Sequence, residues 1–110
     1  MNPLPDLPES FVRAVRAGRF HDAATDGALH ARWTDKKDGL ARALLILAAA
    51  HHHASTGNAE GARLKLGRAV RYLEALPLDP FAALLIEHAR EALSALAERR
   101  KLPPLPIGFR

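Results

Sequence analysis

The fold is decided by Gly39-Leu-Ala-Arg-Ala-Leu-Leu-Ile-Leu-Ala-Ala-Ala-His-His-His-Ala-Ser55, a stretch without proline. Its apolar residues are not confined to one side of a helical wheel. A helix that is apolar almost all round is normally the most buried one in a protein. We therefore predict a central helix over residues 39–55. A turn at Thr56-Gly57-Asn58 should follow, in which Asn58 or Thr56 caps the next helix.

The sequence on both sides of this stretch predicts four more helices. The 110 residues include 22 Ala and 18 Leu but only nine β-branched residues, which favours helix over strand. Apolar periodicity and the positions of Gly and Pro place these helices at residues 9–17, 19–32, 59–76 and 80–101. We predict one all-α domain over residues 1–110. It should be a compact bundle of about five helices with an extended lead-in over residues 1–8 and an extended, proline-rich tail over residues 102–110.

The composition bears on the compartment and on the partners. The chain has no cysteine, which excludes disulfides and thiolate metal sites. Its longest apolar run, Ala43 to Ala50, is far shorter than the roughly 20 residues that span a bilayer. The N-terminus lacks the basic and apolar regions of a signal peptide. We therefore expect a cytoplasmic protein with no membrane partner.

The net charge of +4 lies entirely in the second half of the chain. After residue 60 there are nine basic and five acidic residues. Four of the basic residues lie opposite the apolar face of the helix predicted over residues 59–76: Arg63, Lys65, Arg68 and Arg71. Such a face could follow a phosphate backbone or could simply be solvated. Aromatic side chains that would stack on bases are scarce. Nucleic-acid binding is therefore an alternative rather than the main prediction.

Histidines and carboxylates suggest one candidate metal site. Asp22, Asp26 and His30 are spaced four residues apart and would share one face of a helix. With His52 or His53 they could hold a divalent metal, or they could form a solvated polar face. The neighbours His51, His52 and His53 point about 100° apart and cannot converge on one ion, so at most one of them faces inward. No other cofactor is predicted.

The C-terminal segment contains Pro103-Pro-Leu-Pro106, which fits the P-x-x-P pattern of peptides that bind aromatic grooves. At the end of a helical domain, the same segment could lie as an extended strap across the bundle. Ile107 and Phe109 would then anchor it.

Two stretches together resemble a known family. Arg16-Ala-Gly-Arg-Phe-His-Asp-Ala23, followed by Trp33, the apolar helix ending in His and Gly57-Asn58-Ala-Glu-Gly61-Ala62, is similar to the prokaryotic domain-of-unknown-function family 309. The likeness covers roughly residues 10–76. It implies an all-helical bundle without an established activity. It also implies structural roles for Gly18, Phe20, Trp33, Gly57, Asn58, Gly61 and Ala62.

The chain departs from the family signature G-x-F-x-E-A-H-E-x-x-E-x-x-W. Counted from Gly18, Asp22 stands for the first Glu, and Ala24, Thr25 and Ala28 occupy the later His and Glu positions. Counted from Trp33, Asp26 takes the His position and His30 that of the later Glu. His52 or His53 matches the family His that ends the third helix, and we expect it to be hydrogen-bonded inside the bundle.

These patterns predict a non-enzymatic module that pairs with itself or with another protein. The surplus of apolar and small-residue helical surface favours this interpretation, together with the absence of a catalytic sequence motif. A divalent-metal-binding or degenerate hydrolase-like protein using Asp22, Asp26 and His30 is the first alternative. Nucleic-acid binding through the basic helix face is the second.

Overall fold

A computed structural model describes residues 9–22, 39–76 and 80–106, with the backbone alone described for residues 9–12 and 39–41. Four helices make up most of these residues: α1 (Glu9–Arg16), α3 (Gly39–Ser55), α4 (Ala59–Glu74) and α5 (Pro80–Ala97). Phe20, His21 and Asp22 are also helical, and none of the described residues lies in a strand. The predicted all-α class is confirmed. Trp33 and most of the helix expected over residues 19–32 lie outside the described residues.

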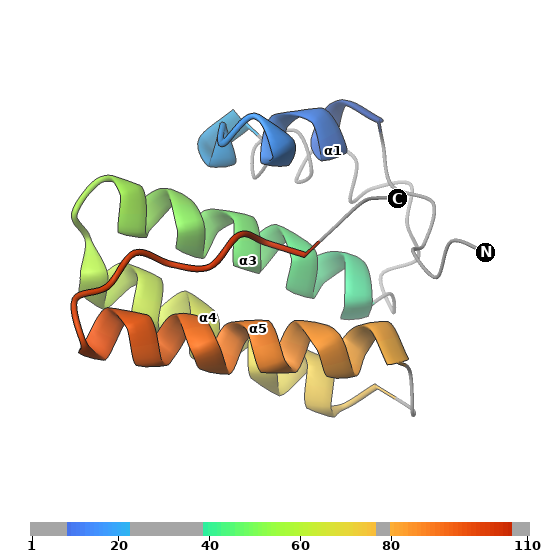
Figure 1. The fold of residues 1–110 in the computed structure, drawn as a ribbon. Coiled ribbons are helices and arrows are strands. Elements are labelled where there is room, and N and C mark those ends of the chain that lie inside the picture. Colours follow the sequence, from blue (N-terminus) through green and yellow to red (C-terminus); the bar gives the residue numbers. More distant parts are fainter. Residues whose placement is uncertain (1–8, 23–38, 77–79, 107–110) are drawn as a thin grey trace.

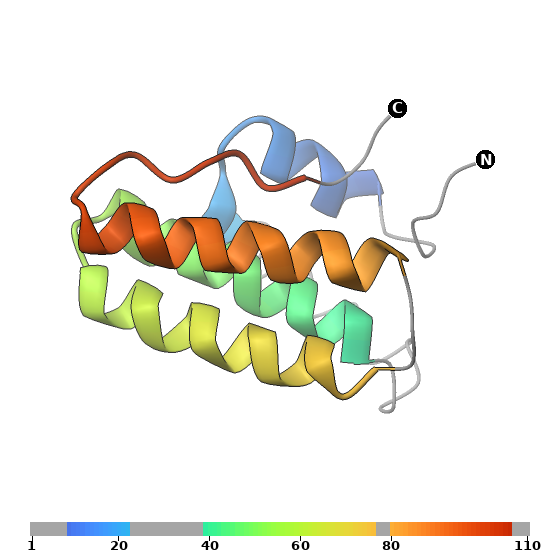
Figure 2. The same cartoon turned by 60° about the horizontal axis from the view of Figure 1, so that its bottom comes forward.

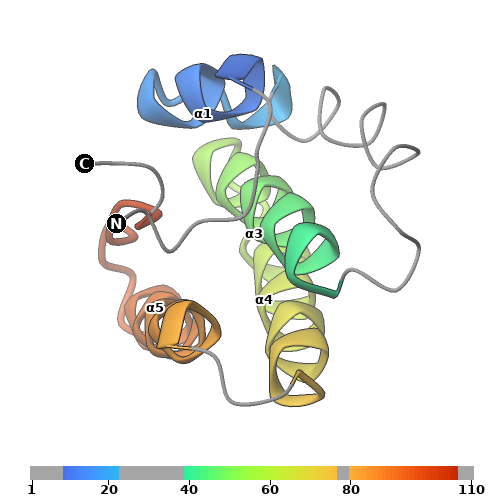
Figure 3. The same ribbon diagram turned by 90° about the vertical axis from the view of Figure 1, so that its right-hand side faces the viewer.

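The helices α3, α4 and α5 run up, down and up, and α4 packs closely against both of its neighbours (Figure 1). Helix α1 lies on the side of α3 that faces away from α4. Seen end-on in Figure 3, the C-terminal segment fills the side of the bundle between α1 and α5. Figure 2 shows the same segment running along α5 over most of the length of that helix. The bundle is thus covered on one side by extended chain.

The core is built from a few leucines and many alanines. Leu44, Leu47, Leu66, Leu73 and Leu85 are the largest fully buried side chains, and they come from α3, α4 and α5. Alanines without any exposed surface occupy the same helices: Ala43, Ala48, Ala50, Ala62, Ala69, Ala89, Ala92 and Ala95. Side chains this short allow helix axes to come close. From Ala43 to Ala54 every α3 side chain is buried or half-buried, as predicted for the most buried helix, but α4 is the helix that packs against two others.

Glycines end the first and the third helix in the same way. Gly57 has a φ of +83°, its N–H donates to the Ala54 carbonyl, and the Asn58 N–H donates to the His53 carbonyl. This is a Schellman motif, in which a left-handed residue satisfies the last carbonyls of a helix. Gly18, with a φ of +77°, ends α1 with the same pair of hydrogen bonds. The C-cap predicted at Gly18 is present.

Asn58, rather than Thr56, caps helix α4. Its side-chain oxygen accepts a hydrogen bond from the Gly61 N–H at 2.9 Å. A Cβ atom at position 61 would come within 2.5 Å of the Asn58 amide nitrogen, so the cap requires glycine there. The spacing Gly57-Asn58-x-x-Gly61 therefore encodes one helix end and the next helix start.

Helix α5 ends at Ala97, four residues before the predicted end at residue 101. Arg99 has a φ of +59°, its N–H donates to the Leu96 carbonyl, and the Arg100 N–H donates to the Ala95 carbonyl. This is a third Schellman motif, with arginine where glycine is usual. Sequence reasoning missed it because no glycine marks the position. Helix α4 likewise ends at Glu74, two residues early, with Ala75 as its C-cap.

Beyond this turn, residues 101–106 are extended, and we call them the strap. The extended tail was predicted from residue 102 onward, and Lys101 was expected in the helix. Leu105 is buried in the core cluster, and Leu102 packs against it. Leu105, inside the P-x-x-P stretch, thus packs against the helices of its own chain. This favours an intramolecular strap over a motif that binds another protein. Ile107 and Phe109, the expected anchors, lie outside the described residues.

The left-handed residues allow a direct test of helix-end strain. Arg99→Gly should stabilise the protein by about 1 kcal/mol, because it relieves the cost of a side chain in this backbone region. Gly57→Ala should destabilise it by a similar amount through the backbone alone, since a Cβ at position 57 would meet nothing within 4 Å. Urea unfolding midpoints measure both effects. Equal effects of the same sign would contradict the assignment of these motifs.

Candidate functional site

His51 is the inward-facing member of the histidine triplet. It continues the buried face of α3 four residues after Leu47 and seven after Leu44, which is the spacing of one helix side. Only 5% of its surface is exposed, whereas His52 and His53 are half-buried. The expectation that His52 or His53 lies hydrogen-bonded inside the bundle was therefore wrong, because His51 occupies that place.

The His51 ring meets His88 of α5 in the interior. The two Nε2 atoms lie 2.9 Å apart, at hydrogen-bond distance, and His88 is also 5% exposed. The ring planes differ by only 6° and the centroids are 5.1 Å apart. That separation is close to the nitrogen–nitrogen distance plus one ring radius on each side. The rings therefore meet edge to edge, and a hydrogen bond along the line of their nitrogens links α3 to α5.

The pair is a neutral one. One imidazole must donate through Nε2–H and the other must accept, so the two rings hold opposite tautomers. Burial lowers the pKa of each imidazole from 6.5 to about 4, and at His51 the neighbouring His88 adds to this lowering. Protonating the accepting Nε2 would place two N–H groups against each other. The bundle is thus built around two histidines that are uncharged at neutral pH.

The segment after α1 and the C-terminal end of α3 hold further rings around this pair. The centroid of Phe20 lies 4.7 Å from that of His51, and His21 lies 4.8 Å from His52. The Asn58 amide donates to Nδ1 of His53 across 3.2 Å. His53 therefore supports the turn between α3 and α4, and His51 alone of the triplet reaches the interior.

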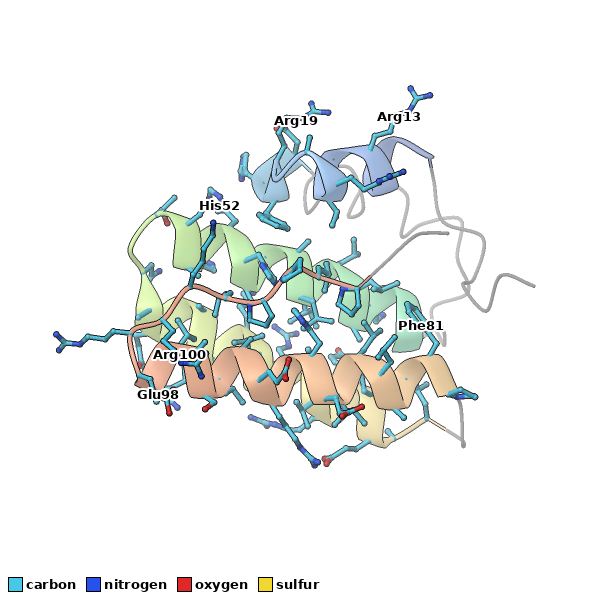
Figure 4. All side chains as sticks on the ribbon, viewed as in Figure 1. Arg13, Arg19, His52, Phe81, Glu98 and Arg100 are labelled. Carbon is cyan, nitrogen blue, oxygen red and sulfur yellow. The ribbon has the colours of Figure 1, made fainter. Side chains whose placement is uncertain are left out.

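A groove opens beside His51 at the C-terminal ends of α3 and α5. It has a volume of about 560 Å³, and its lining comes from four segments of the chain. The apolar contributors are Phe20, Ala54, Leu96, Leu102, Pro103 and Pro104; the polar ones are His51, Ser55, Arg100 and Lys101. We call this space the strap groove. Arg100 and Glu98 lie together at the corner where α5 gives way to the strap (Figure 4).

The structure does not assemble the predicted metal ligands within the residues that it describes. Asp22 is exposed and pairs with Arg19 at 3.6 Å, while Asp26 and His30 lie outside the described residues. His52 and His53 have ring centroids 5.9 Å apart. Residues 9–22, 39–76 and 80–106 contain no group of three or more His, Asp or Glu side chains able to hold a metal ion.

Of the four predicted basic residues, one forms an ion pair and three do not; Arg68 and Arg71 are exposed, and Lys65 is half-buried. Arg63 forms a two-pronged ion pair with Glu60, whose hydrogen bonds lower the pKa of that carboxyl. Lys65, Arg68 and Arg71 form no salt bridge with any described residue. We call these three, with the exposed Leu64, the α4 face.

Helix α5 presents the opposite charge. Glu87 and Glu91 lie at its surface without a salt bridge to any residue in the described part of the chain. Leu84, three residues before Glu87, is 45% exposed. We call Leu84, Glu87 and Glu91 the α5 face.

Sequence reasoning missed His88 and the α5 face, although both leave a signal. His88 falls between Leu85 and Ala92 at spacings of three and four, which marks a buried helix position. A histidine there, and another in phase with the leucines of α3, could have suggested a pair. The distance between them could not have been predicted, since it depends on how α3 and α5 pack.

Comparisons with known proteins leave the family open. No protein-family model, no curated protein and no solved structure matches this chain. The resemblance to the domain-of-unknown-function family 309 therefore stays a prediction. None of the described helices has the length and apolar character needed to cross a membrane.

The buried pair predicts acid sensitivity. Because the folded pKa values lie below 6.5, the unfolded chain takes up protons first as the pH falls. The stability from neutral histidines is therefore complete above about pH 6.5 and is lost toward pH 4. One histidine contributes roughly 3 kcal/mol to this loss. Urea unfolding at pH 7.5 and 4.5 measures it, with His51→Leu/His88→Leu as the variant that should lack this component. An identical pH dependence in both proteins would contradict the assignment.

Removing one partner should cost more than removing both. His88→Leu leaves the His51 Nε2 without its partner in the interior and should destabilise the protein by about 1–3 kcal/mol. The double variant His51→Leu/His88→Leu should recover much of this loss, because no polar nitrogen is then stranded. His52→Leu, at the neighbouring position, serves as the matched control. Additive effects of the two single changes would contradict a direct bond between the rings.

Proposed function

We propose that this chain is a non-enzymatic helical module that associates with copies of itself, the α4 face of one copy meeting the α5 face of the next. The observation that carries the proposal is that each face combines an exposed leucine with unpaired charges of a single sign. Leu64 is 58% exposed and Leu84 45%, and they are the large apolar side chains most open to solvent among the described residues.

The two faces point in different directions, so they cannot neutralise each other within one copy. Glu74 of α4 and Arg90 of α5 form an ion pair of 3.4 Å that marks where these helices face each other. Around α4, Arg71, Arg68 and Lys65 lie roughly 60°, 120° and 180° from Glu74. Around α5, Glu87 and Glu91 lie roughly 60° and 100° from Arg90, turning away from α4.

An interface between two unlike faces is heterologous, so each copy keeps one free face after the first contact. Such contacts build rings or open chains rather than closed two-fold dimers. In the proposed interface, each leucine is surrounded by charged side chains that would form ion pairs with the other copy. Exposed ion pairs contribute little to binding individually. The association proposed is therefore weak and reversible, and it depends on salt.

The α5 face also favours a protein partner over nucleic acid. Lys65, Arg68 and Arg71 alone would suit a phosphate backbone. A phosphate backbone bound there would leave Glu87 and Glu91 on the α5 face unused, whereas a second copy uses both faces. The cytoplasmic location and the prokaryotic family predicted from sequence are part of this proposal, as is the absence of a catalytic role.

Sedimentation velocity at low and high salt tests the proposal. The wild-type chain should form species larger than a monomer at about 20 mM salt and dissociate at about 500 mM, where charges a few ångströms apart are screened. Arg68→Glu/Arg71→Glu and Glu87→Lys/Glu91→Lys should each remain monomeric. An equimolar mixture of the two variants should associate again, because each interface then pairs opposite charges.

The control is Arg63→Gln, which removes a cation already held by Glu60 and should leave association unchanged. A wild-type chain that stays monomeric at every salt concentration would overturn self-association. A mixture of the charge-reversed variants that stays monomeric would overturn the pairing of these two faces. Binding of duplex DNA by the wild type, lost in Arg68→Glu/Arg71→Glu, would favour the nucleic-acid alternative instead.

A further inference from the structure

The strap groove has the size and the lining of a small-molecule site. Its volume of about 560 Å³ lies within the range of ligand pockets, and most of its wall is apolar. Phe20 comes from the segment after α1, Leu96 from the last turn of α5, and Leu102 from the strap. Because the wall is assembled from separate segments, it exists only in the folded chain.

The inner end of the groove carries no charge. His51 lines it, and burial together with its bond to His88 holds the imidazole neutral at physiological pH. The remaining inner wall consists of Phe20 and Ala54. An apolar group is therefore the part of a ligand that fits here.

The outer end carries positive charge. Arg100 and Lys101 line the groove and are exposed. Arg100 bonds to Glu98 at 2.5 Å, while Lys101 forms no salt bridge with any described residue. Glu91 lines a neighbouring hollow with Arg100 and Lys101, so two carboxylates lie near these two cations. The charged side chains that line the strap groove itself are both cations, which complements a single negative charge. The planar guanidinium also matches the geometry of a carboxylate.

The C-terminal ends of two helices determine where the negative charge of a ligand can bind in the groove. Helices α3 and α5 both end beside the groove, and a helix C-terminus bears partial negative charge. An anion deep in the groove would be repelled by these ends. At the rim, Arg100 and Lys101 provide the cations that a carboxylate can bind. A ligand must therefore enter with its apolar end first.

We propose that the strap groove binds a small amphipathic monocarboxylate, with its apolar body between Phe20, Leu96 and the strap and its carboxylate at Arg100 and Lys101. The groove shares no residue with the α4 face or the α5 face. The proposal does not rest on the self-association proposed above, although Arg100 and Lys101 line a neighbouring hollow together with Glu91 of the α5 face.

Octanoate is a suitable probe, with octan-1-ol and octylammonium as controls of the same chain length. In a titration followed by amide chemical shifts at pH 7, octanoate should produce saturable shifts around residues 96–102. Octan-1-ol should bind more weakly, and octylammonium should not saturate. Equal binding of octanoate and octylammonium would overturn the proposal, since it would mean a merely apolar surface.

Variants that change the charge of the rim distinguish its contribution to octanoate binding from that of the apolar wall. Arg100→Gln/Lys101→Gln should weaken octanoate by about tenfold or more, the value of a charge-assisted hydrogen bond, and leave octan-1-ol unchanged. Glu98→Gln, which frees Arg100, should tighten octanoate. Arg63→Gln, which removes an exposed cation outside the groove and outside both faces, is the matched control and should change neither. Full octanoate affinity in the Arg100→Gln/Lys101→Gln variant would overturn the assignment of the rim.

Phe20→Ala tests the wall and should weaken octanoate and octan-1-ol alike. Circular dichroism establishes whether this variant keeps its helices. If it unfolds, the exposed charge variants still decide the outcome. A folded Phe20→Ala variant that binds both probes as the wild type does would overturn the placement of the apolar body.

Discussion

The close packing of α4 against both α3 and α5 is the constraint on which the rest of the structure depends. Ala62 and Ala69 of α4 are completely buried, and short side chains let helices approach. Helices α3 and α5 each pack on α4. The space between α3 and α5 is filled by side chains larger than alanine. His51 and His88 meet end to end there, so the interior hydrogen bond follows from the helix arrangement.

The same arrangement explains why the strap is needed. Three antiparallel helices leave α3 and α5 open on the side that α1 only partly covers (Figure 3). Leu105 closes that side by packing into the core, and Leu102 extends the cover. The chain can turn back for this purpose because Arg99 adopts a left-handed conformation immediately after α5. Where the strap leaves the helix end, the covering is incomplete, and the strap groove remains.

Charge is distributed in a way that separates the surface from the interior. Among the described residues, the buried titratable side chains are His51 and His88, and both are neutral at pH 7. Charges without a salt bridge lie on the outer faces of α4 and α5. Within the described residues, the salt bridges at Glu60, Glu74 and Glu98 are exposed and contribute little to stability. In the described part of the chain, the interior is therefore stabilised by apolar packing together with the hydrogen bond between His51 and His88. Its surface charges remain available for association.

The sequence by itself determined the helical class, the position of α3, the cap at Gly18 and an extended C-terminal segment, and it narrowed the cap of α4 to Asn58 or Thr56. These features are local, since propensity, glycine and proline act within a few residues. Only the tertiary structure decided that His51 rather than its neighbours is buried, that His88 is its partner and that α5 ends at Ala97. A shift of one residue turns a helix side chain by about 100°, and a contact across 37 positions has no local signature. The groove, formed by four separated segments, belongs to that second group.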